Sequence, residues 1–225
     1  ILLLATELLE DDIAIFENSL APLLVLDSWY PKQNFSSVAI NNIDSVKNAV
    51  EYLINKGHKE IGHIKSSYLI QNFREREHGF LKALELNDIS RNPSNHISLT
   101  PTIDGPYRDM KNFLQSHHVE LPTAFFADND ILALGAMKAL QENGVRIPQD
   151  VSIIGFDDLP FCEISTPSLT TIKVDKEQMG NMAVKMLIDF VIKGDYYPFR
   201  LSVSTEFIER KSVSEPHSYN GPDKL

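Results

Sequence analysis

The sequence predicts an α/β fold in which parallel strands alternate with helices. Short apolar runs of strand length are followed by segments whose apolar residues recur at helical spacing. The clearest case begins with the apolar run Ala124–Ala127, continues through a polar cluster into a helical pattern over Ile131–Asn143, and ends at a second apolar run, Val151–Gly155. This succession is typical of a βαβ unit, which carries its functional groups at the strand ends. The chain is therefore expected to be a ligand-binding α/β protein.

The same alternation defines the other elements. Further strands are expected at Leu23–Leu26, Val38–Ile40, Ile61–Ile64, Ile97–Leu99 and Thr170–Val174, with a last β-rich run at Leu201–Ile208 and a buried strand at the first residues. Further helices are expected from Asp44 to Gly57, from near Arg74 through Leu84, from Pro106 through Leu114 and from Asp175 to Gly194. Asp44 and Asp175 are placed to cap their helices, and glycines supply the left-handed residue at the C-termini. The polar tail from Ser212 is expected to stay mobile.

The composition excludes several classes of function. With 21 basic and 31 acidic residues the net charge is −10, so this chain lacks an electrostatic surface suited to nucleic acid or an anionic membrane. Its single cysteine, Cys162, rules out an intrachain disulfide framework and a multi-cysteine metal site, and suits a reducing cytoplasm. The first apolar run is too short for a membrane span, and the chain has no initiator methionine. We therefore expect a piece of a longer protein.

Polar side chains follow the expected strands, at the edge of a parallel sheet where ligands bind. They are Asp27 and Ser28, Ser66 and Ser67 and on to Arg74, Asp128, Asn129 and Asp130, and Asp157 and Asp158. None of these groups is a strong nucleophile. Carboxylate, amide and guanidinium groups together suit a polyhydroxylated neutral ligand, because each can bond two adjacent hydroxyls.

Each candidate also has a structural interpretation. Asp130 stands directly before the helix at Ile131 and is expected to be its N-cap. Since one cap suffices, Asn129 is left for a ligand, although it could be a turn residue that tolerates left-handed geometry. Asp157 could equally form a turn, and Arg74 could be a solvated helix residue paired with a neighbouring glutamate.

Catalytic and metal sites find little support. His117 and His118 are adjacent, so on a helix their side chains diverge, and the other five histidines are scattered without ligand spacing. The sequence contains no glycine-rich phosphate loop and no Gly-x-Ser-x-Gly elbow. Cys162 lacks the surroundings of a catalytic cysteine and is expected to pack in the core. We expect neither an enzyme nor a cofactor.

Five segments, in matching order and spacing, resemble the lac-repressor-type (LacI/GalR family) transcription regulators. They are Tyr52-Leu-Ile-Asn-Lys-Gly-His-Lys-Glu-Ile-Gly-His-Ile, Arg74-Glu-Arg-Glu-His-Gly-Phe, Asp128-Asn-Asp-Ile-Leu-Ala-Leu-Gly-Ala-Met, Ile147-Pro-Gln-Asp-Val-Ser-Ile-Ile-Gly-Phe-Asp-Asp and Pro167-Ser-Leu-Thr-Thr-Ile. The resemblance implies an effector-binding domain of the type I periplasmic-binding-protein fold, in which two doubly wound parallel-sheet lobes hold a small molecule between them. Residues 1–42 and 174–200 would form an incomplete N-terminal lobe, 43–173 and 201–211 the C-terminal lobe, and 212–225 a polar tail.

The resemblance also implies partners. Operator DNA would be bound through a helix-turn-helix absent from this chain, by a cytoplasmic homodimer, and some relatives use a phosphocarrier protein as co-regulator. The helix from Ile131 is apolar around nearly its whole circumference, so a second subunit could cover it. The alternative function is a sugar-binding protein of a transport system, which shares the fold.

Carried over residue by residue, the resemblance implies that Arg74, Asn129 and Asp157 bind the effector. Relatives that bind purines depart from the asparagine, so Asn129 favours a sugar or sugar-like molecule. Many sugar-binding relatives place glutamine where this chain has Val174, so the particular sugar cannot be copied from a relative.

Overall fold

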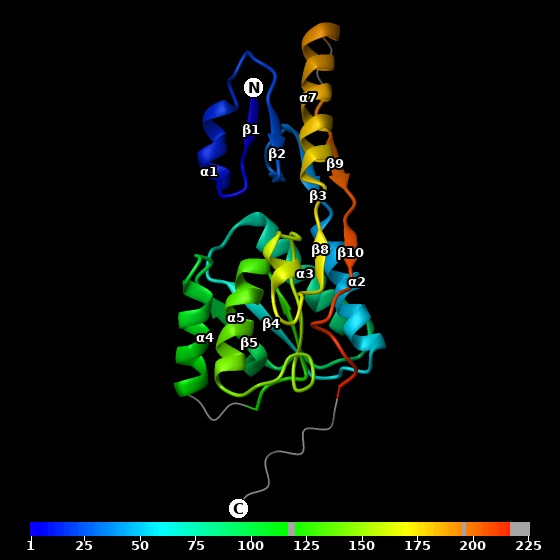
Figure 1. Ribbon diagram of the computed structural model, residues 1–225. Helices are drawn as coiled ribbons and strands as arrows, with labels where there is room; N and C mark the ends of the chain where they lie inside the picture. The colour runs from blue at the N-terminus through cyan, green and yellow to red at the C-terminus, as the bar shows by residue number, and fades with distance from the viewer. Residues whose placement is uncertain (117–119, 195–196, 217–225) are drawn as a thin grey trace, which may run out of the picture. The chain divides into compact units, whose positions relative to one another are not determined.

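The computed structural model describes residues 1–116, 120–194 and 197–216, and in these ranges it has an α/β architecture with two parallel sheets (Figure 1). The chain divides into two compact units. Unit 1 comprises residues 1–42, 69–75 and 174–205, and unit 2 comprises residues 43–68, 76–173 and 206–225. Within the described ranges, no helix has the length and apolarity that crossing a membrane requires.

Unit 1 is built on a four-stranded parallel sheet of order β1-β2-β3-β9. Its strands are β1 (Leu2–Leu4), β2 (Leu24–Leu26), β3 (Ser36–Ile40) and β9 (Arg200–Val203). Its helices are α1 (Glu10–Ile13), the short 3₁₀ turn η1 (Ala14–Phe16) and α7 (Lys176–Lys193), which packs on β1, β2 and β3. The expected buried strand at the start of the chain is wrong in one respect, because Leu2 and Leu4 of β1 are exposed.

Unit 2 contains a second four-stranded parallel sheet, of order β5-β4-β6-β7. Its strands are β4 (Ile61–Ser66), β5 (His96–Leu99), β6 (Ala124–Ala127) and β7 (Ser152–Ile154). Unit 2 also contains a separate two-stranded antiparallel sheet, formed by β8 (Thr171–Lys173) and β10 (Glu206–Ile208). The expected run at 201–208 is thus two strands in different units, because Leu201 pairs with Val38 of β3 and Phe207 with Ile172 of β8.

Helices cover both faces of the unit 2 sheet. They are α2 (Asn42–Asn55), α3 (Gln71–Leu86), α4 (Gly105–Ser116), α5 (Asp130–Glu142), the short α6 (Phe161–Ile164) and the 3₁₀ turn η2 (Pro93–Asn95). Along β4, Ile64 points into the core that α4 and α5 share, whereas His63 contacts Phe80 of α3, because successive side chains of a strand point to opposite faces. Helix α3 therefore covers the face opposite to α4 and α5.

The structure accounts for most of the predicted helix ends. Asp175 caps α7, since its Oδ1 accepts a hydrogen bond of 2.8 Å from the amide of Gln178, and Gly194 ends that helix in the left-handed conformation. Gly57 and Gly144 also have positive φ. Asp44 is not the residue before its helix, because α2 begins at Asn42 and Asp44 lies in the first turn.

Helix α5 is buried within unit 2 itself. Its neighbours are β4, β6 and β7 on one side and α4 on another, and Figure 1 shows α4 and α5 side by side. Gly135 marks the close approach, because a Cβ there would lie 2.6 Å from Cβ of Pro106. The apolar circumference of this helix therefore does not by itself require a second subunit, contrary to the argument made from the sequence.

The described part of the polar tail is packed. Ser212 is fully buried, and its Oγ donates to the carbonyl of Ile153 at 2.6 Å and accepts from the amide of Thr170 at 2.8 Å. The carbonyl of Ser214 lies 2.9 Å from Nε2 of His58. The expectation of a mobile tail from Ser212 is therefore wrong for residues 212–216, and residues 217–225 lie outside the described ranges.

Candidate functional site

The carboxyl ends of three neighbouring strands in unit 2 carry the polar residues that the sequence singled out. Strand β4 ends at Ser66, β6 leads into Asp128 and Asn129, and β7 leads through Phe156 into Asp157. Because β4, β6 and β7 are parallel and adjacent, these residues lie along one edge of the sheet. Asp157 and Asp158 both have positive φ, 110° and 51°, a conformation that is uncommon for residues other than glycine and is found more often at functional sites.

Arg76 of α3 joins this edge. Its guanidinium lies over the ring of Phe156, with 3.6 Å between the guanidinium carbon and the ring centroid, and it donates a hydrogen bond to the carbonyl of Asp128. One guanidinium nitrogen is 3.6 Å from Oδ1 of Asp157. The Arg76 side chain is only 4% exposed, while that of Asp157 is 25% exposed. The arrangement places a fixed cation beside a carboxylate that faces solvent in part.

Arg74, the arginine selected from the sequence, is placed elsewhere. It falls in unit 1, whereas Asn129 and Asp157 fall in unit 2, and its side chain is exposed. Within unit 2, the arginine beside Asp157 is Arg76. A signal for Arg76 was present in the sequence, because it continues the apolar face of α3 at helical spacing between Phe73 and Phe80. An arginine on such a face needs a buried partner, which here is the ring of Phe156.

The residue that caps α5 is Asn129 and not Asp130, which the sequence predicted to be the cap. Asn129 is the N-cap of α5, since its Oδ1 accepts a hydrogen bond of 2.9 Å from the amide of Leu132. Asp130 is inside the helix and fully buried, where it accepts hydrogen bonds from the amide of Leu159 at 2.8 Å and the hydroxyl of Thr171 at 2.6 Å. Burial raises the pKa of Asp130 to about 6 against the opposing effect of these bonds. The cap uses the amide oxygen of Asn129, so the amide nitrogen is the part that suits a ligand.

Asp128 is a structural residue with both carboxylate oxygens engaged. One oxygen lies 2.7 Å from Nε2 of His63, and the other accepts from the amide of Ser66 at 2.8 Å. Its carbonyl holds Arg76, as described above. Asp128 therefore joins β4, β6 and α3 and does not present its own side chain to a ligand.

The strand-end group of unit 1 belongs to a separate polar network. Asp27 accepts from Nδ2 of Asn72 at 3.2 Å and from the hydroxyl of Thr6 at 2.6 Å. Glu75 accepts from Asn42 and Trp29, and forms an ion pair of 3.0 Å with Arg200. These bonds tie the first turn of α3 to the sheet of unit 1.

Cys162 is fully buried, as expected for a packed residue. Burial and the neighbouring Asp130 carboxylate raise the pKa of its thiol, which keeps it in the unreactive protonated form.

Known proteins are similar to this chain in sequence and in fold. The family model of the periplasmic binding protein-like domain matches residues 50–213. The HTH-type transcriptional repressor PurR of Haemophilus influenzae (strain PittEE) is 35% identical over 217 residues, which cover 95% of this chain and 64% of the repressor. This chain therefore spans somewhat under two thirds of that relative's length.

Two solved structures are also similar. A LacI family transcriptional regulator from Enterococcus faecium with bound ribose superposes with a TM-score of 0.82 at 26% identity, covering 95% of this chain and 79% of that one. The complex of the transcriptional regulator CelR with cellobiose gives a TM-score of 0.83 at 27% identity, covering 94% and 64% of the two chains.

With these matches added to its two parallel-sheet units, the chain belongs to the family of periplasmic binding protein-like domains. Its relatives within that family are lac-repressor-type regulators, which confirms the resemblance found in the five sequence segments. The PurR relative is a transcriptional repressor, and the two solved relatives are transcriptional regulators.

Proposed function

We propose that this chain is the effector-sensing domain of a DNA-binding transcription regulator, and that its effector is a small sugar or sugar-like molecule. Binding of the effector shifts the balance between two conformations of the protein and so controls operator binding. The observation that carries the proposal is the fixed guanidinium of Arg76 beside the carboxylate of Asp157, at the carboxyl end of the unit 2 sheet.

The geometry of this pair suits hydroxyl groups. A ligand hydroxyl that lies beside both groups can accept a hydrogen bond from Arg76 and donate one to Asp157. The Phe156 ring and the Asp128 carbonyl hold the guanidinium before ligand arrives, which lowers the entropy lost on binding. The amide nitrogen of Asn129 supplies a further donor. In this proposal Arg76 takes the role first assigned to Arg74.

The comparisons support two classes of effector. Solved relatives carry ribose and cellobiose, which supports a sugar. A purine is the second candidate, because the 35% identical relative is the repressor PurR, which binds purines. The carboxylate of Asp157 and the amide of Asn129 can bond the edge of a base as well as a diol. We favour the sugar because purine-binding relatives depart from the asparagine at position 129.

The proposed regulator acts in the cytoplasm as a homodimer that contacts operator DNA through a helix-turn-helix outside this chain. Repressor relatives support the regulator over the alternative, a sugar-binding protein of a transport system, which shares the fold. A phosphocarrier protein is a further partner in this proposal, as co-regulator.

A thermal-shift screen against sugars, sugar phosphates and purines tests the effector. A ligand at about 100 times its Kd stabilises the folded protein by about 2.7 kcal/mol. A response to purines alone would replace the sugar, and no response to either class would contradict the proposal.

Two substitutions then test the site. Asp157→Asn keeps the size of the side chain and removes its charge, so it should abolish the shift produced by the active ligand. Arg74→Ala is the matched control for the choice of arginine, because its exposed side chain should not affect binding. If Arg74→Ala removes the response and Asp157→Asn leaves it unchanged, the site is not the one described.

A further inference from the structure

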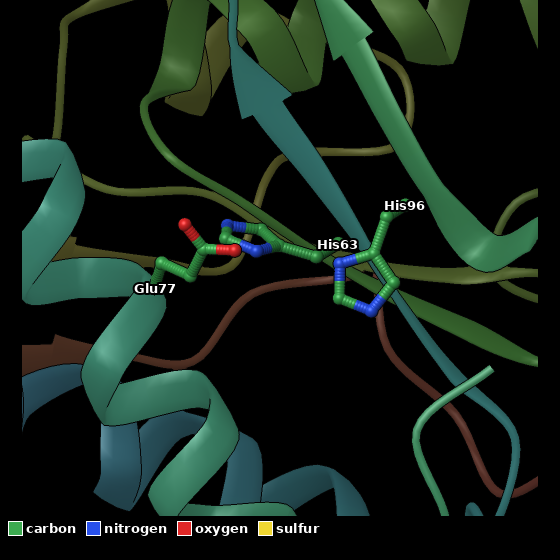
Figure 2. A group of neighbouring side chains, drawn as sticks. All are labelled: His63, Glu77 and His96. Atoms are coloured by element: carbon green, nitrogen blue, oxygen red, sulfur yellow. The ribbon is translucent and has the colours of Figure 1, made fainter. Parts of the chain in front are cut away.

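Three potential metal ligands converge on the α3 face of the unit 2 sheet, away from Asp157. His63 of β4 and His96 of β5 are partners in the parallel register, so their side chains stand next to each other on one face of the sheet. Glu77 of α3 reaches the same place from the helix that covers this face. One ligand atom from each residue lies within 4.8 Å of the other two. Figure 2 shows the His63 ring between the Glu77 carboxyl group and the His96 ring.

Both imidazoles have an unused nitrogen at this place. Nδ1 of His63 and Nδ1 of His96 are buried and have no hydrogen-bond partner among the described residues. A buried polar atom without a partner lowers the stability of the folded protein by about 1–3 kcal/mol, so such atoms are rare unless they have a function. His63 itself is fully buried, which makes the cost of its Nδ1 especially large.

The surroundings of His63 prepare that nitrogen for a cation. Its Nε2 lies 2.7 Å from the carboxylate of Asp128, which can only accept, so Nε2 carries the proton. In the neutral form of the ring the lone pair is then on Nδ1. Histidines that bind metals commonly donate their other N–H to a carboxylate in this way, which fixes the ring and makes the free nitrogen a stronger ligand.

We propose that His63, Glu77 and His96 form a binding site for a divalent transition cation such as Zn²⁺. Two imidazole nitrogens and one carboxylate oxygen are ligands that zinc prefers, and water can fill a fourth position. With bonds of about 2.0–2.1 Å, tetrahedral ligand atoms lie about 3.4 Å apart, so the three groups must approach by at most about 1.4 Å. The Glu77 side chain, 28% exposed and flexible, can supply most of this movement.

Two neighbouring cationic side chains, Lys65 and Arg91, already bond to the proposed ligands, and both contacts must be compatible with a bound metal. Nζ of Lys65 is 2.6 Å from Oε1 of Glu77, which leaves the second oxygen of that carboxylate to reach the metal. Nε of Arg91 donates to Nε2 of His96 at 3.3 Å, and this long bond has to open, because a metal on Nδ1 puts the ring proton on Nε2. Arg91 is exposed, so its side chain can turn into solvent at little cost.

The alternative is that the two histidines only pack. His63 stacks on Phe80 with 4.7 Å between ring centroids, and His96 meets the same ring edge-on. Packing explains the burial of the rings, but it explains neither the two unpartnered nitrogens nor the carboxylates on either side of His63.

The test uses tag-free protein stripped of metal with EDTA. Titration with Zn²⁺ by calorimetry should show one equivalent bound at neutral pH, and Co²⁺ should give the visible absorption of a tetrahedral site. Replacing one ligand, in His96→Gln or Glu77→Gln, should weaken Zn²⁺ binding on the order of 100-fold. Circular dichroism of the metal-free variants shows that they are folded, so that loss of binding is not loss of structure.

Matched controls separate this site from other histidines. His78→Gln alters an exposed histidine next to Glu77, and it should leave both titrations unchanged. The double substitution of His117 and His118 by glutamine removes the adjacent pair in the sequence and should have no effect either. The proposal is overturned if the wild-type protein binds no stoichiometric Zn²⁺ or Co²⁺, if His96→Gln binds as well as wild type, or if binding is lost with the His117–His118 pair. None of these outcomes depends on the proposed effector.

Discussion

Replacement of Gly79 by alanine should destabilise unit 2, although alanine is the better helix former. Gly79 lies in α3 against the start of α2, and a Cβ built on it would be 2.4 Å from the carbonyl oxygen of Ile43. An ordinary contact begins at 3.4 Å, so the overlap is about 1 Å. The Ile43 oxygen belongs to the backbone and cannot rotate away as a side chain could, so α3 itself has to move.

The magnitude follows from two opposed terms. Overpacking of this kind costs about 1–3 kcal/mol, and replacing glycine by alanine inside a helix returns about 1 kcal/mol. We expect Gly79→Ala to lower the free energy of unfolding by up to about 2 kcal/mol. Because α3 also carries Arg76, its displacement should weaken effector binding as well.

Gly180→Ala is the matched control. It makes the same substitution in α7, where, apart from the chain neighbours and the helix's own backbone, no heavy atom of the described residues lies within 4 Å of the added Cβ. It should therefore raise stability by about 0.5–1 kcal/mol. Urea unfolding followed by far-ultraviolet circular dichroism measures both changes, and fluorescence of the single tryptophan, Trp29, reports on unit 1 separately. If Gly79→Ala were as stabilising as Gly180→Ala, the close approach of α3 to α2 would be refuted.

Three further predictions concern the cap, a buried histidine and the tail. Asn129→Ala should cost about 1 kcal/mol of stability and Asn129→Asp little, whereas both should weaken effector binding; equal unfolding curves for the alanine and wild-type proteins would contradict the cap. Burial lowers the pKa of His58, so the folded state binds fewer protons than the unfolded one and stability should fall as the pH drops below about 6.5. Urea midpoints across this range should show that slope in wild type and a shallower one in His58→Gln. Ser212→Ala should cost about 1–3 kcal/mol by leaving the Thr170 amide without its acceptor; a neutral Ser212→Ala would mean that this residue is not packed.

Local signals in the sequence located most of the longer helices and strands. Strand Ala124–Ala127 was predicted with the bounds that the structure shows, and the caps Asp175 and Gly194 of α7 hold because the bonds they make are local. Periodicity decides such elements, since it depends only on neighbours along the chain. The same reasoning missed α6, which has only four residues and is too short for any period to show.

The sequence did not decide which of two neighbouring, chemically similar residues takes a given structural role. Asn129 and Asp130 are both good capping residues, and only the position of Thr171 and of the Leu159 amide makes Asp130 the buried one. Arg74 and Arg76 differ by about half a turn of helix, and only Phe156 and Asp157 from a distant strand end select Arg76.

The sequence by itself determined the α/β class, the family resemblance and the strand ends where a ligand would bind. Tertiary structure alone decided which side chains meet there, because contacts between residues far apart in the chain arise only when strands pair in register. The histidines at 63 and 96 show this most directly, since they are scattered in sequence and become neighbours through the pairing of β4 with β5.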